Sequence, residues 1–302
     1  MKLLIPVKSL ALLLALLAGL AGPARAASAP PAAPTFPPYA IEHSQLRVLP
    51  PTADRRQYEL QIHLPASYAS EPHRRYPVLY VTDGYWDFPT MQTSYNNLVY
   101  DRTVPEFIIV GLGYAGENLN YGSLRRWELS PATLDNDGES TGHAAIFLRT
   151  LAQEIIPFVA REYRVDPSYR VLAGSSLGGL FTLYAMLTKP ELFQAYIAAS
   201  PAVNVHDNWL FSYEDSFAQS GKALPVRLYL TGAENEWPGF LAGIKRFHER
   251  LSARGYAGLV YQFRLIDGVR HAGTKAESYV RGMQFAFAPF APETGPMQDH
   301  PY

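Results

Sequence analysis

The chain has 302 residues, of which 48% are hydrophobic, so it can bury a large core and is not a disordered chain. Its 26 lysines and arginines nearly balance 27 aspartates and glutamates, which leaves no basic footprint for nucleic acid or for an anionic membrane. The absence of cysteine excludes disulfides, thiolate metal centres and a cysteine nucleophile.

The first 26 residues have the pattern of a secretory signal peptide. Lys2 and Lys8 precede an apolar run over 10–20, and Ala24 and Ala26 form a cleavage site of the A-x-A type. The run is shorter than the roughly 20 residues that cross a bilayer. We therefore expect a periplasmic or secreted protein with no stable membrane anchor after signal cleavage.

Composition also predicts the domain boundaries. Residues 27–38 are rich in alanine and proline and are expected to form an extended leader. Residues 289–302 hold four prolines and no periodic pattern, which indicates a C-terminal tail. No repeat or second linker interrupts the rest, so 39–288 is predicted to be one domain.

Strand and helix patterns alternate along this domain. Residues 57–65 alternate between apolar and polar, as in a half-buried strand, and 76–82 and 107–112 are continuous apolar runs typical of strands buried on both faces. Apolar residues over 144–163 have helical spacing. The alternation predicts an α/β fold with a mostly parallel sheet and helices on both faces. Further strands are expected at 170–173, 226–231 and 259–266, further helices at 177–187, 239–253 and 277–287, and loops at 114–142 and 206–223.

A serine turn follows the strand at 170–173. The sequence Gly174-Ser-Ser-Leu-Gly178 matches G-x-S-x-G between a strand and a helix, the context of a nucleophile elbow. Side chains two residues before and after the serine would collide in such a tight turn, and glycine removes them. Ser176 is therefore predicted to be a strained, exposed nucleophile. The N–H of Leu177 is predicted to bind the oxyanion.

The serine needs a base, and in this order an acid and then a histidine follow it along the chain. His248 lies in a helical pattern, His300 lies in the tail, and His206 comes before the next strand. His271 lies in the loop after the last strand, where an elbow fold needs its base. His271 is therefore predicted to be the general base.

The acid is expected in the loop after the strand at 226–231. This loop contains Glu234 and Glu236. We favour Glu234, because it is closer to the strand end and so better tied to the sheet. Glu236 is the alternative.

A second oxyanion donor is expected after an early central strand. The strand at 76–82 is followed by Asp83-Gly84, where the glycine permits a sharp turn, so the Tyr85 N–H could face the serine. The aromatic residues Tyr85, Trp86 and Trp237, which are expected near the pocket, favour an aromatic or acyl-bearing substrate such as a catecholate siderophore, and Trp86 is a substrate-binding candidate.

Taken in order, these motifs resemble the esterase family that includes enterochelin and other siderophore esterases, esterase D-type enzymes and mycolyltransferases. The resemblance implies an α/β-hydrolase fold and a serine hydrolase without metal or cofactor, and it supports Tyr85 and Leu177 as oxyanion donors. In siderophore esterases, an arginine three residues before an acidic–hydrophobic–x–Pro motif contacts substrate, and Arg125 matches this spacing. Some siderophore esterases work with a Ser–His pair alone, so the resemblance leaves the need for an acid open. The resemblance spans 57–287 and is carried by 76–84, 147–166, 174–180, 190–201 and 268–271.

The sequence therefore predicts a secreted or periplasmic serine carboxylic-ester hydrolase. It would act through an acyl-enzyme on a small-molecule ester, such as a siderophore or aryl ester. The alternatives are an acyltransferase on the same fold and a non-catalytic binding protein, with a peptidase ranked below them. Neither the natural ester nor the oligomeric state follows from the sequence.

Overall fold

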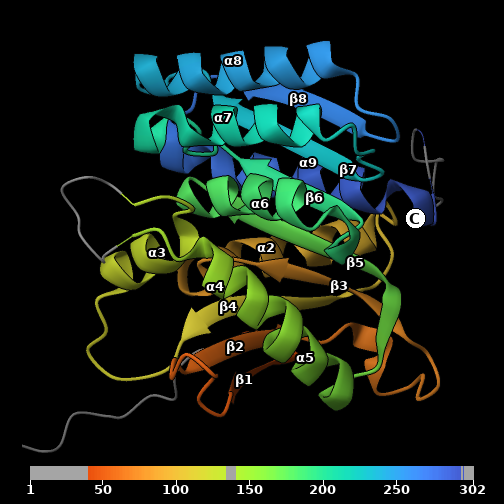
Figure 1. The fold of residues 1–302 in the computed structure, drawn as a ribbon. Helices are drawn as coiled ribbons and strands as arrows, with labels where there is room; N and C mark the ends of the chain where they lie inside the picture. Colours follow the sequence, from red (N-terminus) through yellow and green to blue (C-terminus); the bar gives the residue numbers. More distant parts are fainter. Residues whose placement is uncertain (1–39, 134–140, 294, 296–302) are drawn as a thin grey trace, which may run out of the picture. The chain divides into compact units, whose positions relative to one another are not determined.

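The computed structural model describes residues 40–133, 141–293 and 295. The predicted signal peptide and leader, and residues 296–302 of the predicted tail, lie outside the described residues. From residue 41 onward the chain forms one unit built on an eight-stranded sheet with the order β1-β2-β4-β3-β5-β6-β7-β8 (Figure 1). The strands are β1 (Ser44–Val48), β2 (Tyr58–His63), β3 (Tyr76–Val81), β4 (Ile108–Tyr114), β5 (Val165–Ser175), β6 (Ala195–Ala199), β7 (Arg227–Ala233) and β8 (Val260–Ile266).

The sheet is mostly parallel. The pairings β1–β2 and β2–β4 are antiparallel, and β4, β3, β5, β6, β7 and β8 are parallel to one another. The carboxyl ends of β3, β5, β6, β7 and β8 therefore meet at one edge, which is where ligands bind in open α/β sheets.

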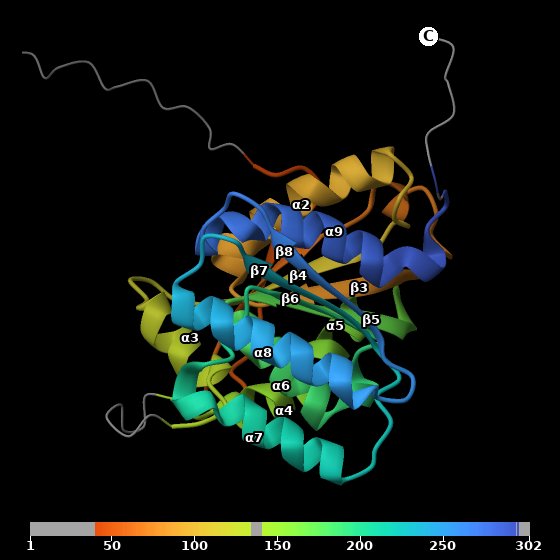
Figure 2. The ribbon, with the colours of Figure 1, turned by 90° about the horizontal axis from the view of Figure 1, so that it is seen from above.

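Helices cover both faces of the sheet. Figure 2 shows α2 and α9 on one face and α3 to α8 on the other. This arrangement confirms the predicted α/β-hydrolase architecture. The helices are α2 (Gly84–Tyr100), α3 (Tyr121–Leu129), α4 (Ala144–Thr150), α5 (Ile156–Glu162), α6 (Leu177–Thr188), α7 (Val205–Gln219), α8 (Pro238–Arg254) and α9 (Thr274–Phe287). Short 3-10 turns lie at Ala66–Tyr68, Pro190–Leu192, His271–Gly273 and Ala288–Phe290, and a π turn lies at Leu151–Ile155.

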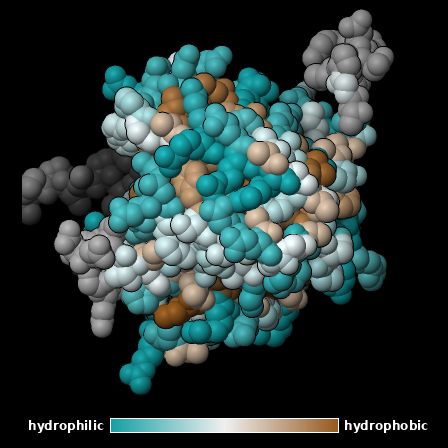
Figure 3. Space-filling model, turned by 45° about the horizontal axis from the view of Figure 1, so that its top comes forward, coloured by the Kyte–Doolittle hydropathy of each residue, from teal (hydrophilic) through white to brown (hydrophobic). Residues whose placement is uncertain are grey.

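The central strands are buried on both faces, which explains their continuous apolar runs. In β3, Val78 and Tyr80 pack into the core layer under α4, α6 and α8, whereas Leu79 and Val81 pack into the layer under α2 and α9. Hydrophilic residues predominate on the face shown in Figure 3, where hydrophobic residues form small separate patches. No helix within the described ranges is both long and apolar enough to cross a bilayer.

Three helices differ from the expectation. The segments expected as loops contain α3 and most of α7. Helix α2 begins three residues after the end of β3, in a segment where the sequence predicts no helix. Only Glu128 and Leu129 of α3 are buried, so it has little apolar periodicity. In α7 the residues His206, Asp207 and Asn208 have left-handed backbone angles, which interrupts the helical pattern near its start.

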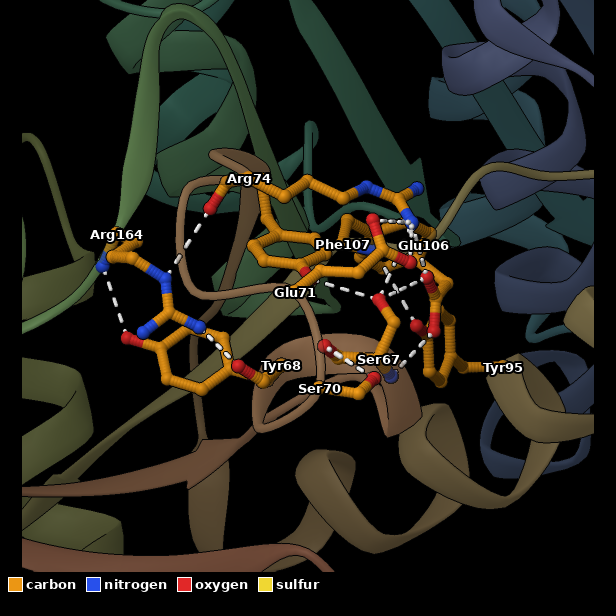
Figure 4. A network of polar contacts seen from close by, with 10 residues as sticks. Ser67, Tyr68, Ser70, Glu71, Arg74, Tyr95, Glu106, Phe107 and Arg164 are labelled. Carbon is orange, nitrogen blue, oxygen red and sulfur yellow. Dashed lines mark hydrogen bonds and ion pairs between the residues drawn. The ribbon is translucent and has the colours of Figure 1, made fainter.

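At the opposite edge, a polar network joins the amino ends of β3 and β4 (Figure 4). The Glu106 carboxylate accepts hydrogen bonds from the Ser67 N–H at 3.0 Å and from Arg74 Nη1 at 2.8 Å. The Ser67 hydroxyl also lies 2.8 Å from the hydroxyl of Tyr76, the first residue of β3. This network fastens the 3-10 turn at Ala66–Tyr68 to the sheet, away from the edge that carries the serine turn.

Candidate active site

Ser176 occupies the strained turn that the sequence predicts. Its backbone angles are φ 58° and ψ −117°, and it lies between β5 and the first residue of α6. The Ser176 N–H donates to the carbonyl of Ala199 at 3.0 Å, and its own carbonyl accepts from the N–H groups of Leu180 at 2.9 Å and Ala202 at 3.0 Å. These bonds hold the serine in a conformation that a non-glycine residue rarely adopts.

The two glycines of the turn are sterically required. A Cβ atom at Gly174 would lie 2.4 Å from the carbonyl oxygen of Gly178. A Cβ atom at Gly178 would lie 2.2 Å from the Thr82 hydroxyl oxygen. The end of β3 therefore packs directly against the serine turn, and the G-x-S-x-G spacing has the steric basis expected from the sequence.

The turn after β3 brings a second helix start to the same edge. Asp83 has left-handed angles of φ 54° and ψ 41°, and a Cβ atom at Gly84 would lie 2.8 Å from the backbone carbon of Gly111. The chain turns there and places Tyr85 in the first turn of α2. Backbone N–H groups in a first helical turn have no acceptor within the helix. The amides of Tyr85 and Leu177 are thus both available as donors.

Asp83 also pairs with Arg125. The buried carboxylate accepts from Nε at 2.7 Å and from Nη2 at 2.8 Å. This bidentate geometry fixes the guanidinium on α3. Arg125 lines a cavity of about 280 Å³ together with Ser176 and Leu177. The predicted substrate contact therefore lies in the serine cavity, although two of its N–H groups are used by Asp83.

His271 is held by Glu236. The distance from its Nδ1 to Glu236 Oε2 is 2.7 Å, and the Glu236 side chain is 0% exposed. The Ser200 hydroxyl donates to the same Oε2 at 2.7 Å, and the Trp237 N–H donates to Oε1 at 3.2 Å. A buried carboxylate with these donors can fix the tautomer and orientation of the imidazole.

The preference for Glu234 as the partner of His271 is therefore corrected to Glu236. The Glu234 N–H donates to Ile266 at 2.9 Å and so continues the pairing of β7 with β8. Its side chain is exposed and accepts a hydrogen bond from the Gly268 N–H at 2.7 Å. Closeness to the strand end thus fixes the backbone of Glu234, but its side chain contacts Gly268 and not His271, whereas the side chain of Glu236 is directed inward.

Aromatic rings place His271 beside the serine cavity. The ring of Phe240 lies 5.0 Å from the His271 ring, and Phe240 also lines the cavity that contains Ser176. Trp237 lies 5.2 Å from the His271 ring and is 64% exposed. The imidazole therefore lies between a cavity wall and a solvent-facing indole.

A second aromatic group, which we call the aryl platform, consists of Tyr85, Trp86 and Tyr121. The rings of Tyr85 and Tyr121 stack at 4.8 Å, and Trp86 lies 5.9 Å from Tyr85. Tyr85 is 59% exposed and Trp86 is 44% exposed. The Arg125 Cζ lies 5.8 Å from the Trp86 ring, so the platform adjoins the serine cavity.

Sequence reasoning missed three residues of this site. Phe240 lies in no motif, and Ser200 and Asp83 lie in motifs that predict no role for their side chains, yet each contacts a candidate catalytic or substrate-binding side chain. The signal available for Ser200 was its position directly after a buried strand and before Pro201. His206, set aside as a base, lines the serine cavity.

One buried acid near the site is not used by this arrangement. Glu128 on α3 accepts a hydrogen bond from the Tyr58 hydroxyl at 3.0 Å. Burial raises the pKa of Glu128 to about 8, although hydrogen bonds from Tyr114 and Tyr58 act in the opposite direction. With its pKa raised in this way, the carboxyl is mostly protonated in the folded protein at neutral pH.

This protonation makes stability depend on pH. The folded pKa of Glu128 exceeds the ordinary 4.5, so the folded state binds more protons between pH 4.5 and about 8. The resulting stabilisation is fully present below pH 4.5 and is lost as pH rises to about 8. The free energy of unfolding should fall by about 1.4 kcal/mol per pH unit from this group. Denaturant titrations of Glu128→Gln should lack that slope, and the exposed control Glu249→Gln should keep it. An equal slope in both variants would contradict the assignment.

The strained serine before α6, the carboxylate-bound histidine after β8 and the parallel sheet define an α/β-hydrolase. The family model described as "Putative esterase" matches residues 52–249. The chain belongs to this esterase family and is a serine esterase. No group of three or more potential metal ligands occurs within the described ranges.

Individual relatives agree with this family. Ferri-bacillibactin esterase BesA of Bacillus subtilis (strain 168) is 27% identical over 271 residues, which cover 84% of this chain and 93% of BesA. The crystal structure of the BES protein from Bacillus cereus superposes with a TM-score of 0.75 at 24% identity, covering 84% of this chain and 98% of that one. The crystal structure of an IroE-like serine hydrolase from Shewanella oneidensis gives a TM-score of 0.74 at 22% identity, covering 83% of this chain and 82% of that one. These two structures share the fold of this chain.

Proposed function

We propose that the chain is an exported serine carboxylic-ester hydrolase with Ser176, His271 and Glu236 as its catalytic triad. The observation that carries this proposal is the pairing of the buried Glu236 with the half-buried His271 beside the cavity that contains the strained Ser176. A buried carboxylate that orients a histidine near a serine lining a cavity is the arrangement that activates a hydroxyl nucleophile.

In this mechanism, the Ser176 hydroxyl oxygen attacks the ester carbonyl carbon while His271 Nε2 takes its proton. Glu236 stabilises the imidazolium through the Nδ1–H bond. The amides of Leu177 and Tyr85 bind the oxyanion. The tetrahedral intermediate collapses and expels the alcohol, which receives the proton from His271. Water then attacks the acyl-enzyme with His271 as base, and the acid is released as Ser176 regains its proton.

The proposed substrates are aryl-bearing esters of the siderophore type. The aryl platform offers exposed rings on which a planar aromatic group can stack, and the guanidinium of Arg125, fixed by Asp83, lies beside it. The name of BesA, a ferri-bacillibactin esterase, supports the same substrate class.

Export is proposed from the pattern of residues 1–26. The basic start, the short apolar run and the small residues before position 27 support cleavage there and release from the membrane. Cell fractionation with N-terminal sequencing of the product tests this: the expected chain begins at Ala27 outside the cytoplasm, and a full-length cytoplasmic chain would contradict it.

The substrate proposal is tested with matched aryl and alkyl esters, including a catecholate siderophore ester. Replacement Trp86→Ala should raise KM for the aryl esters by about fivefold, because an aromatic contact contributes about 1 kcal/mol. The alkyl esters should be nearly unaffected. The control is Tyr100→Ala, because Tyr100 is 80% exposed and lies at the other end of α2. This replacement should leave KM unchanged for both the aryl and the alkyl esters.

An equal effect of Trp86→Ala on both ester classes would contradict aryl recognition by the platform.

Product analysis in the presence of an alcohol acceptor should show the free acid. A transferred acyl ester as the main product would instead make the chain an acyltransferase.

A further inference from the structure

An ion pair between a buried aspartate and a half-buried lysine, outside the triad, joins α2 to α9. The carboxylate of Asp87, in the first turn of α2, is 0% exposed and pairs with Lys275 Nζ through Oδ1. The hydroxyl of Tyr279 donates to Oδ2 of the same carboxylate. Lys275 and Tyr279 lie one turn apart on α9, and Figure 2 shows α2 and α9 side by side on one face of the sheet.

The α2 end of this ion pair is fixed to the oxyanion turn. The N–H groups of Asp87 and Trp86 both donate to the carbonyl of Asp83, at 3.0 Å and 2.9 Å. Tyr85, the proposed oxyanion donor, lies inside this hydrogen-bonded turn. A displacement of Asp87 would therefore move the Tyr85 amide with it.

The α9 end is fixed to the histidine turn. The hydroxyl of the buried Thr274 donates to the carbonyl of His271 at 2.7 Å, and Lys275 is the next residue along the chain. Lys275 thus lies one residue beyond the hydrogen-bonded turn that presents the imidazole.

Helix α9 also contacts the residues that hold the acid. The hydroxyl of Ser278 lies 2.8 Å from the Thr231 hydroxyl, whose oxygen accepts from the Ser200 N–H at 3.3 Å. Ser200 in turn donates to Glu236 at 2.7 Å. These hydroxyl groups are buried, so α9 is coupled to the histidine and the acid through two separate sets of hydrogen bonds.

We propose that Asp87 and Lys275, assisted by Tyr279, are positioning residues that hold the oxyanion turn and the histidine turn at the separation needed for acylation. This inference rests on the proposed triad. A buried ion pair is weak evidence for stability by itself, because desolvation opposes its attraction. Its position between two turns that must converge on one ester group assigns it a geometric role, since errors of about 1 Å in such sites cost roughly 100-fold in rate.

The side chains around Asp87 support this role. Burial raises the pKa of its carboxyl, while Lys275 and Tyr279 lower it, and the nearby Asp83 raises it further. An unpartnered Asp87 would be poorly tolerated there. The two helices are thus held together by a contact that cannot slide without leaving a buried charge uncompensated.

The test uses Asp87→Asn, Lys275→Met and Tyr279→Phe in the purified enzyme, with Lys275→Arg as the conservative rescue. Glu106→Gln is the matched control, because Glu106 belongs to a similar polar network at the opposite edge of the sheet (Figure 4). The readouts are the melting temperature, kcat and KM for an aryl ester well below melting, and the rate of inactivation by a fluorophosphonate.

All three disruptive variants and the control should lower the melting temperature. Only the disruptive variants should lower kcat and the inactivation rate, by roughly 100-fold for Asp87→Asn and Lys275→Met and by about tenfold for Tyr279→Phe, with KM nearly unchanged. Lys275→Arg should recover most of kcat. If Asp87→Asn does not fold, the inference is tested by comparing kcat of Tyr279→Phe with kcat of Glu106→Gln. Tyr279→Phe removes one hydroxyl and keeps the core filled.

A melting shift with unchanged kcat in the Asp87, Lys275 and Tyr279 variants would make the pair structural and overturn the inference. That outcome differs from failure of the proposed function, in which wild-type activity would persist in Ser176→Ala. Equal loss of kcat in Glu106→Gln would also overturn the inference, because the effect would then be general.

Discussion

Replacing Glu236 by glutamine should lower kcat for ester hydrolysis by about 10⁴-fold. A glutamine keeps the shape of the side chain, but it can present its NH₂ group to His271 Nδ1 and stabilise the wrong tautomer. It also removes the negative charge that balances the imidazolium. KM should change little, since Glu236 is buried behind the histidine and does not line the serine cavity.

Glu234→Gln is the matched control for this prediction. Glu234 is two residues away and bonds only to the Gly268 N–H among the described hydrogen bonds of its side chain, so kcat should stay near the wild-type value. Steady-state kinetics of both variants on one aryl ester decides between the two acids. A large loss in Glu234→Gln, with Glu236→Gln active, would restore the preference drawn from the sequence. Near wild-type kcat in both would indicate a Ser–His pair that needs no acid.

Both Ser176→Ala and Ser176→Gly should lower kcat by about 10⁶-fold, because neither variant can form the acyl-enzyme. The two should differ in stability. At φ 58° and ψ −117° a residue with a Cβ atom is strained, by an amount of order 1–3 kcal/mol, and glycine relieves that strain. Glycine also loses more backbone entropy on folding, so the net gain should be about 1 kcal/mol.

Denaturant unfolding of the two variants measures this difference. Ser176→Ala should match the wild-type free energy of unfolding closely, and Ser176→Gly should exceed both. Equal stability in the two variants would show that the serine turn stores no backbone strain. Wild-type activity in either variant would exclude Ser176 as the nucleophile.

Much of the fold follows from local sequence patterns. The continuous apolar runs at 76–82 and 107–112 became β3 and β4 at the centre of the sheet, because only strands covered on both faces need such runs. Helices α3 and α7 were not predictable in the same way. Most of α3 is not buried, and α7 contains three residues with left-handed angles near its start, so neither has the regular apolar spacing of a helix packed on a core.

The site shows a similar division. Ser176 and His271 were predictable because steric rules and chain order restrict where they can lie. The choice between Glu234 and Glu236 depends on the direction of each side chain after β7, and spacing alone contains no such information. The contacts of Ser200 and Asp87 join segments far apart in the chain, so they become visible only when the strand ends and helices are assembled.

The most direct test of the account is covalent labelling of the purified mature chain with a fluorophosphonate, followed by peptide mapping. We expect a single adduct on the peptide that contains Ser176, and no adduct in the folded Ser176→Ala variant, because only a base-activated serine reacts readily with this reagent. An adduct that maps elsewhere or persists in Ser176→Ala, or a folded wild-type chain that does not react, would contradict the central claim that Ser176 is the nucleophile.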